Sequence, residues 1–190
     1  MSAEVWLVDV GRSEISFSLR HLIVAQISGQ VRRWQAVLRI DPERPGLSSV
    51  EAVLDASSID TGEVERDDHI RSPEFLNVVR FPQILFRSQG ITHVAGNRYR
   101  VGGDLTLRNT TREVTLEMED LGRKTDQAGR ATTCFRAHAQ INRQDFGLHW
   151  NQDLDTGGIV LGDKVEIKIA IEAVEAARDH AAAEPSPSGQ

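Results

Sequence analysis

Four histidines are the first candidates for acid, base or ligand chemistry, because imidazole titrates near neutral pH. They are His21, His69, His138 and His149. His138 falls on the polar phase of an alternating segment and is expected to be exposed, whereas His21 continues the apolar phase of the segment before it. His21 is therefore the better site candidate, although a hydrogen-bonded core histidine is the simpler interpretation.

The other chemically capable residues carry less weight. Asp67, Asp68 and His69 have metal-ligand side chains, but three consecutive helical residues cannot all face one ion, so solvated or capping side chains explain them better. Cys134 is the single cysteine and lacks a neighbouring basic cluster that would activate its thiol. The sequence has no phosphate-binding glycine loop, nucleophile elbow or zinc-protease helix motif. We therefore expect no catalytic residue, no metal site and no cofactor.

Strands must position these residues. Apolar and polar side chains alternate with a period of two in eight segments: 15–19, 34–40, 50–54, 84–86, 99–107, 114–118, 135–141 and 165–171. Each of these segments has one apolar face. The pattern predicts an antiparallel all-β fold, either a barrel or a sandwich, and periodicity alone does not choose between them.

Three segments interrupt the alternation. Residues 61–79 predict one or two short helices, beginning near Asp60 or Thr61 as cap and broken at Pro73. Residues 145–151 either close one end of a barrel or form a strand with a glycine bulge and a core tryptophan. The glycines at 157, 158 and 162 predict a tight hairpin before the last strand.

Length and charge exclude several classes of protein. The 190 residues predict one domain, and the change to an Ala-, Asp- and Glu-rich composition predicts a short disordered tail at 174–190. With 22 Lys and Arg against 28 Asp and Glu, the formal net charge of −6 argues against nucleic acid as a partner. The N-terminus lacks a secretory signal pattern, which predicts a cytoplasmic location. No apolar run approaches the roughly 20 residues of a membrane-spanning helix, so the chain is not expected to be integral to a membrane.

Several blocks of the sequence resemble one family. The most specific are Ser58–Gly62, Arg66-Asp67, His69–Pro73, Phe81-Pro82, Gly103–Leu107, Asn142-Arg143, Asp145–Leu148, Trp150-Asn151 and Gly162-Asp163. They resemble the YceI-like family, soluble bacterial polyisoprenoid-binding proteins, over Trp6 to Glu172. The chain departs from the family pattern at Arg12, at Leu76-Asn77 and at Asn109-Thr110, and none of these changes removes an apolar strand face.

The resemblance implies an extended antiparallel β-barrel, similar to lipocalins, over residues 1–173, with a long apolar tunnel. It implies a non-catalytic role in binding, transport or storage of an isoprenoid lipid, such as a quinone tail or a polyprenyl phosphate, and a possible homodimer. Alternation and resemblance together predict these ligand-binding residues: Phe17, Leu19, His21, Trp34, Leu54, Ile84, Phe86, Leu105, Leu107, Leu116, Phe135, Phe146 and Asn151. Of these, His21 and Asn151 are expected to contact a head group.

Two alternatives remain open at this point. An enzyme acting on a quinone-like or other apolar molecule would use His21 with Asp145 or His69 as acid and base. A closed structural module would instead have a filled core and bind a protein partner through residues 61–79.

Overall fold

A computed structural model describes residues 3–21, 25–151 and 161–176. Its strands are β1 (Glu4–Val8), β2 (Glu14–His21), β3 (Ala25–Val31), β4 (Trp34–Ile40), β5 (Ser49–Asp55), β6 (Ile59–Asp60), β7 (Gln83–Ala95), β8 (Arg98–Leu107), β9 (Thr110–Thr125), β10 (Ala131–Asn142) and β11 (Leu161–Glu175). The α-helix is α1 (Val64–Arg71), and the 3-10 turns are η1 (Val10–Arg12), η2 (Pro45–Leu47), η3 (Ala56–Ser58) and η4 (Arg143–Phe146).

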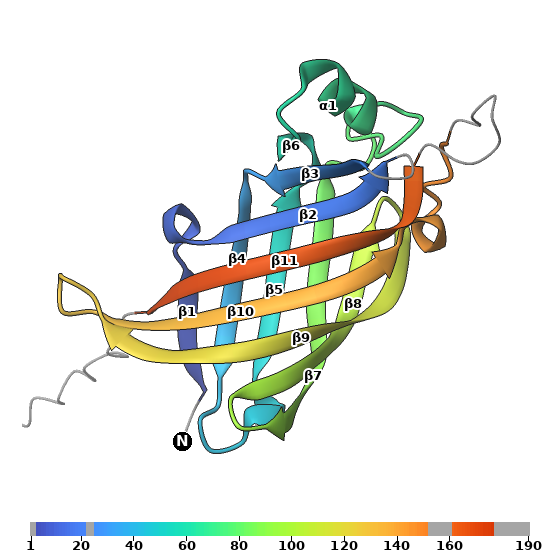
Figure 1. Ribbon diagram of the computed structural model, residues 1–190. Coiled ribbons are helices and arrows are strands. Elements are labelled where there is room, and N and C mark those ends of the chain that lie inside the picture. The colour runs from blue at the N-terminus through green and yellow to red at the C-terminus, as the bar shows by residue number, and fades with distance from the viewer. Residues whose placement is uncertain (1–2, 22–24, 152–160, 177–190) are drawn as a thin grey trace, which may run out of the picture.

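Eight antiparallel strands form a closed barrel (Figure 1). They follow the order β1-β4-β5-β7-β8-β9-β10-β11, and β11 pairs back with β1. One edge of β11 is shared, because its residues from Leu161 to Ala170 pair with β2 and its last residues pair with β1. The strands β2, β3 and β6 therefore extend the wall beyond the closed ring. This confirms the predicted barrel and excludes the sandwich.

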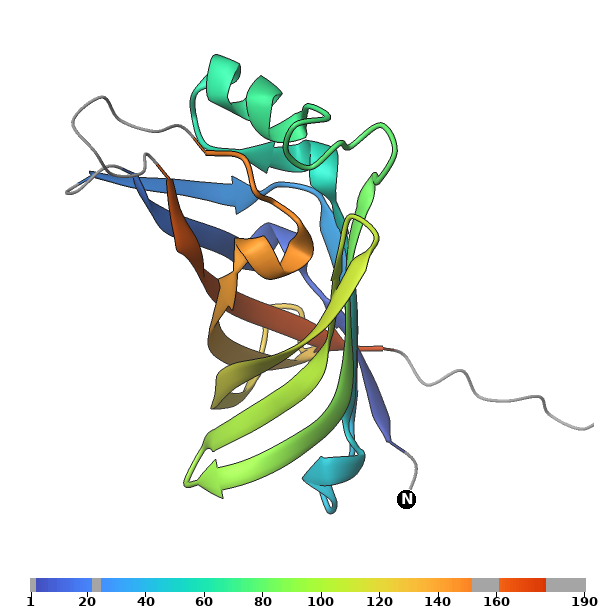
Figure 2. The ribbon, with the colours of Figure 1, turned by 90° about the vertical axis from the view of Figure 1, so that its right-hand side faces the viewer.

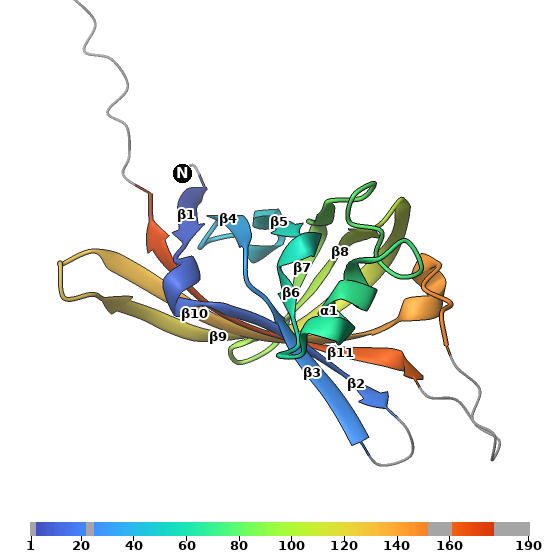
Figure 3. The same cartoon turned by 90° about the horizontal axis from the view of Figure 1, so that it is seen from above.

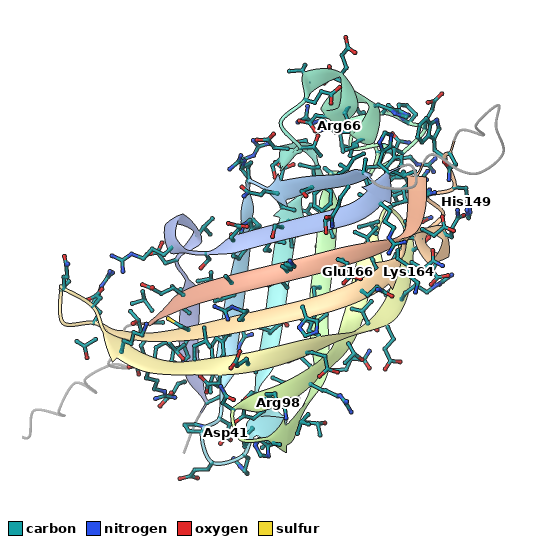
Figure 4. All side chains as sticks on the ribbon, viewed as in Figure 1. Asp41, Arg66, Arg98, His149, Lys164 and Glu166 are labelled. Atoms are coloured by element: carbon teal, nitrogen blue, oxygen red, sulfur yellow. The ribbon has the colours of Figure 1, made fainter. Side chains whose placement is uncertain are left out.

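The alternation seen in the sequence separates the inside of the barrel from the outside. On β11, Val165, Ile167 and Ile169 face the interior, whereas Lys164 and Glu166 lie on the outer surface, as Figure 4 shows. Figure 3, a view from above, shows α1 over one end of the barrel, while β2 and β3 project to one side. No helix in the described parts of the chain is long and apolar enough to cross a bilayer.

The helical segment begins later than the sequence predicted. The N-cap of α1 is Glu63, not Asp60 or Thr61. The carboxylate of Asp60 instead accepts a hydrogen bond from Gly62 N at 2.8 Å, and the backbone N–H and hydroxyl of Thr61 both donate to Asp67. Asp67 is buried, so it is not a solvated side chain, and its carboxylate instead bonds to the backbone N–H of Thr61 just before the helix. The helix ends at Arg71, with Ser72 as its C-cap directly before Pro73, as predicted.

Three strands were not predicted, and several others, such as β7 and β9, run well beyond the alternating segments. β1 carries apolar residues on both faces, since Trp6 is fully buried while Leu7 is 51% exposed, and β3 is rich in polar residues and glycine. β6 has only two residues. β11 continues to Glu175, two residues past the expected boundary, because these residues pair with β1. The remainder of the predicted tail, from residue 177, and the glycines at 157 and 158 lie outside the described residues.

Gly103 allows the barrel wall to pack closely around Phe86. A Cβ atom at this position would lie 2.6 Å from the carbonyl oxygen of Arg87 and 2.7 Å from Cζ of Phe86. The next residue back, Gly102, has no atom within 4 Å of the corresponding point. Neighbouring glycines of one strand thus differ in how much space they leave.

We expect Gly103→Ala to lower the free energy of unfolding by about 1–3 kcal/mol, the usual cost of overpacking. Gly102→Ala, the matched control, should leave it unchanged or raise it by up to about 1 kcal/mol. Urea denaturation of both variants measures the difference. Equal free energies of unfolding for the two variants would contradict the close packing at Gly103.

Candidate functional site

The barrel encloses a cavity of about 840 Å³. Its wall comes from β4, β5, β7 to β11, β2 and β3, and the middle of this wall is almost wholly aliphatic and aromatic. A volume of this size is at the upper end of the range for small-molecule sites. Asp41 and Arg66 both line the cavity, and Figure 4 places them at opposite ends of the barrel, so the cavity runs along its length.

Eleven of the thirteen predicted ligand-binding residues lie on the cavity wall. They are Phe17, Leu19, His21, Trp34, Leu54, Ile84, Phe86, Leu105, Leu107, Leu116 and Phe135. Their role toward a ligand stays a prediction. His21, at the end of β2, is half-buried on this wall.

Phe146 and Asn151 do not line the cavity, contrary to prediction. Phe146 lies in η4, is only 2% exposed and borders a second, smaller hollow. The side-chain amide of Asn151 donates to the carbonyl of Leu161 at 2.8 Å and accepts from its N–H at 2.9 Å. That amide ties the 143–151 segment to the start of β11, which explains why it does not point into the cavity.

The cavity end near α1 holds a cluster of three rings that the sequence analysis did not bring together. His69 on α1 packs edge-on against Trp150, with ring centroids 4.3 Å apart, and Phe75 lies 6.2 Å from His69. All three residues line the cavity. The Nε2 atom of His69 is buried and lies 3.2 Å from a carboxylate oxygen of Glu74, out of line for a hydrogen bond. This nitrogen is therefore a buried polar atom without a hydrogen-bond partner among the described residues.

Arg143 organises the same end of the barrel from a fully buried position. Its guanidinium donates to the backbone carbonyls of Leu148, Trp150, Leu161 and Gly162, and to a carboxylate oxygen of Asp163 at 3.0 Å. Burial lowers the pKa of Arg143, and the neighbouring Asp163 opposes that shift. These contacts occupy all five N–H donors of the side chain. The motif Asn142-Arg143 pointed to this residue, but not to its role in holding two loops together.

Arg66 is the other cation on the wall near α1. It donates to the hydroxyl of Thr61 at 2.8 Å, to the carbonyl of Thr61 at 3.0 Å, and to the carboxylate of Glu63 at 2.6 Å. Glu63 also lines the cavity. The charge of Arg66 is therefore balanced at the wall itself.

Asp41 fixes the opposite end of the cavity. This buried carboxylate accepts hydrogen bonds from the backbone N–H groups of Arg44 and Glu43, at 2.9 and 3.1 Å, and pairs with the Arg44 side chain at 3.0 Å. The backbone hydrogen bond from Arg44 is the main reason that the pKa of Asp41 lies below its usual value. The charge at this end is thus compensated as well.

The remaining candidates lie apart from the cavity. His138 is exposed, as predicted, and His149 is exposed and contacts the side-chain oxygen of Gln144. Cys134 is buried. Asp145, one proposed partner of His21, is exposed and does not line the cavity. Within the described residues, no three His, Cys, Asp or Glu side chains form a metal-ligand group.

Comparison with known proteins gives one consistent result. The family model of the YceI-like domain matches residues 6–173. A UPF0312 protein of Staphylococcus epidermidis is 33% identical over 167 residues, covering 86% of this chain and 94% of that protein. The protein YceI of Salmonella newport is 32% identical over 161 residues, covering 85% of this chain and 81% of that protein.

Solved structures share the barrel. BcnA of Burkholderia cenocepacia aligns with a TM-score of 0.76 and 24% identity, covering 87% of this chain and 98% of that one. A polyisoprenoid binding domain from Saccharophagus degradans aligns with a TM-score of 0.63 and 13% identity, covering 90% and 98% of the two chains. At these identities the likeness shows the fold.

We expect Arg143→Lys to lower the free energy of unfolding by about 3 kcal/mol, because an ammonium cannot replace five fixed donors to buried acceptors. For a chain of this size that corresponds to a melting temperature lower by about 6–12 °C. The exposed residue Arg136 on β10 supplies the control, since Arg136→Lys should stay within about 0.5 kcal/mol of the unchanged protein. Similar melting temperatures for both variants would show that the Arg143 network is not needed for stability.

Proposed function

Because the chain belongs to the YceI-like family, we propose that it binds and carries an isoprenoid lipid in the barrel cavity, without catalysis, and that the lipid has an uncharged head group such as a quinone ring. The observation that carries this proposal is the cavity that runs along the barrel, whose wall consists mostly of aliphatic and aromatic side chains.

The middle of the wall suits an aliphatic chain. A polyisoprene tail has no group that needs a hydrogen bond, and each buried CH₂ contributes about 0.8 kcal/mol. The cavity wall is mostly aliphatic and aromatic along the barrel, so the shape and length of the cavity restrict the tail more than any specific polar contact does. The polyisoprenoid binding domain from Saccharophagus degradans, which has the same fold, supports this class of ligand.

The charges at the α1 end favour a neutral head group over a phosphate. A phosphate buried there would need cations with free donors. Arg143 has no free donor and Arg66 already pairs with Glu63, while Glu74 places a further carboxylate beside His69. A quinone carbonyl needs only one donor, and Nε2 of His69 supplies it when that nitrogen carries the proton. The ring can then pack against Trp150 and Phe75.

The competing hypotheses fare differently. The structural-module hypothesis predicted a filled core, and the cavity contradicts it. The enzyme hypothesis paired His21 with Asp145 or His69, and the structure places His21 and His69 on the cavity wall but not Asp145. Turnover of a quinone that disappears in His21→Ala while binding persists would favour catalysis. A cytoplasmic location and a homodimer also stay predictions.

Native mass spectrometry of protein purified without detergent tests the cargo. We expect a bound mass that organic extraction removes and that fragments in isoprene steps. Ala52→Trp, which adds bulk to the cavity wall, should reduce the occupied fraction at least tenfold, whereas Val53→Trp on the next residue, which does not line the cavity, should keep it. An unliganded mass for the unchanged protein would contradict the carrier role.

The head group is tested with a quinone and a polyprenyl phosphate of equal tail length. We expect the quinone to bind more tightly, and His69→Phe to weaken it about fivefold, the effect of losing one hydrogen bond of about 1 kcal/mol. His138→Phe on the outer surface should have no effect. Tighter binding of the phosphate would refute the neutral head group while leaving the lipid-carrier role intact.

A further inference from the structure

A second hollow lies beside the cavity mouth and carries unpaired positive charge. It has a volume of about 370 Å³ and is lined by Arg80, Phe81, Arg108, Asn109, Thr110, Phe146 and Gly147. Leu107, directly before Arg108, and Leu148, directly after Gly147, line the main cavity. Figure 2 shows the β8–β9 turn and η4 at the same end of the barrel as α1. The hollow is therefore on the rim of the mouth and not inside the tunnel.

Two guanidinium groups share one aromatic ring in this hollow. The Cζ atoms of Arg80 and Arg108 lie 5.3 and 5.6 Å from the centroid of Phe81. Arg108 also donates to the carbonyl of Gly147 at 3.2 Å. Among the described residues, neither guanidinium has a carboxylate within 4.0 Å. Both arginines line the same hollow without a carboxylate partner, an arrangement that favours an anion as ligand there.

The backbone at Arg108 is held in a conformation that an arginine rarely adopts. Arg108 is the first residue of the two-residue turn between β8 and β9 and has a φ of 56°. Glycine is the usual residue at a turn position with positive φ. An arginine at this position costs conformational free energy compared with glycine. The contacts of its side chain with Phe81 and Gly147 offset part of that cost.

Two valines near α1 are exposed to solvent. Val79, directly before Arg80, is 95% exposed, and Val64 at the start of α1 is 75% exposed. Two further arginines near α1 are already paired, Arg66 with Glu63 and Arg71 with Asp68. Arg80 and Arg108 differ from them, since neither has a carboxylate partner among the described residues, and the exposed Val79 directly precedes Arg80.

We infer that Arg80 and Arg108 bind the phosphate of an anionic membrane phospholipid, and that this contact docks the open end of the barrel on a bilayer with Val79 inserted between head groups. Phosphate suits two adjacent guanidiniums, and an exposed valine beside them suits the boundary between head groups and acyl chains. The net charge of −6 does not prevent this, because distant acids are screened beyond about 10 Å at 0.1 M salt. Docking would serve loading and so rests on the proposed lipid-carrier function.

Sedimentation with vesicles tests the inference on the full chain. One set of vesicles contains phosphatidylcholine alone. The other contains phosphatidylcholine with about 30% phosphatidylglycerol, which gives the vesicles a negative surface potential. We expect binding to the anionic vesicles only. Each arginine contributes about fivefold near such a surface, so Arg80→Gln with Arg108→Gln should weaken binding by about twentyfold or more.

The control variant combines Arg98→Gln with Arg136→Gln. Both residues are exposed, neither has an ion pair among the described residues, and the change in net charge is the same. Arg98 lies at the end of the barrel opposite to α1 (Figure 4). This variant should bind like the unchanged protein. Equal losses for the two double variants, or equal binding to both kinds of vesicle, would overturn the inference.

Further variants separate folding from binding and identify the source of the phosphate. Arg108→Gly removes the charge and suits the positive φ, so it should keep or raise the melting temperature yet weaken vesicle binding about fivefold. Val79→Ser should weaken vesicle binding, whereas Leu47→Ser, 60% exposed on η2, should not.

Binding of inorganic phosphate to this hollow without vesicle binding would overturn the membrane docking. Co-purification of a polyprenyl phosphate that is lost in the double variant would overturn it too, by assigning the hollow to the cargo. Vesicle binding and cargo mass are separate readouts, so failure of one does not obscure the other.

Discussion

Closure of the sheet through β11 is the constraint on which the rest of the structure depends. The edge of β11 pairs with β2 along its first part and with β1 at its end, so one strand both closes the ring and begins the β2-β3-β6 extension. At the seam, Trp6, Leu38 and Ala173 form a small core of their own, and the guanidinium of Arg123 lies 5.1 Å from the Trp6 ring. Backbone pairing around the ring leaves few strand edges open, which lets the centre stay hollow without exposing unpaired peptide groups.

A hollow barrel shifts stability to its wall and ends. An apolar cavity forfeits dispersion contacts that a filled core would make, so the surrounding contacts must compensate. Gly103 against Phe86 shows close packing within the wall, and Arg143 shows dense hydrogen bonding at one end. The loop residues that Arg143 holds are those that also place Trp150 beside His69. Stability and the geometry of the mouth therefore depend on the same buried guanidinium.

Period-two alternation could predict most of the wall but little of the mouth. Residues such as Phe86, Leu105 and Ile169 face the interior because an antiparallel strand with one apolar face has one arrangement that hides it. β1 escaped because both of its faces carry apolar residues, and β3 because its polar residues and glycine give no alternation. The ring cluster joins residue 69 on α1 with residue 150, and no local pattern reports such a contact. Phe146 and Asn151 were assigned to the ligand from alternation and family resemblance, but Phe146 is buried in η4 and the side-chain amide of Asn151 bonds to the backbone of Leu161 at the start of β11.

At this end of the molecule, the cations on the cavity wall are paired, whereas those of the second hollow are not. On the tunnel wall, Arg66 and Arg143 have their donors engaged by Glu63, Asp163 and backbone carbonyls, so a charged ligand would find repulsion or an uncompensated burial cost there. On the rim, the exposed Arg80 and the half-buried Arg108 have no carboxylate partner among the described residues, so a phosphate could be bound there without full desolvation. A lipid that moves from a bilayer into the barrel would pass from a charged interface to an apolar interior. The hollow with Arg80 and Arg108 lies at the outer end of that path, and the apolar cavity wall lies at its inner end. The neutral wall would then select the cargo, while the charged rim would select the membrane.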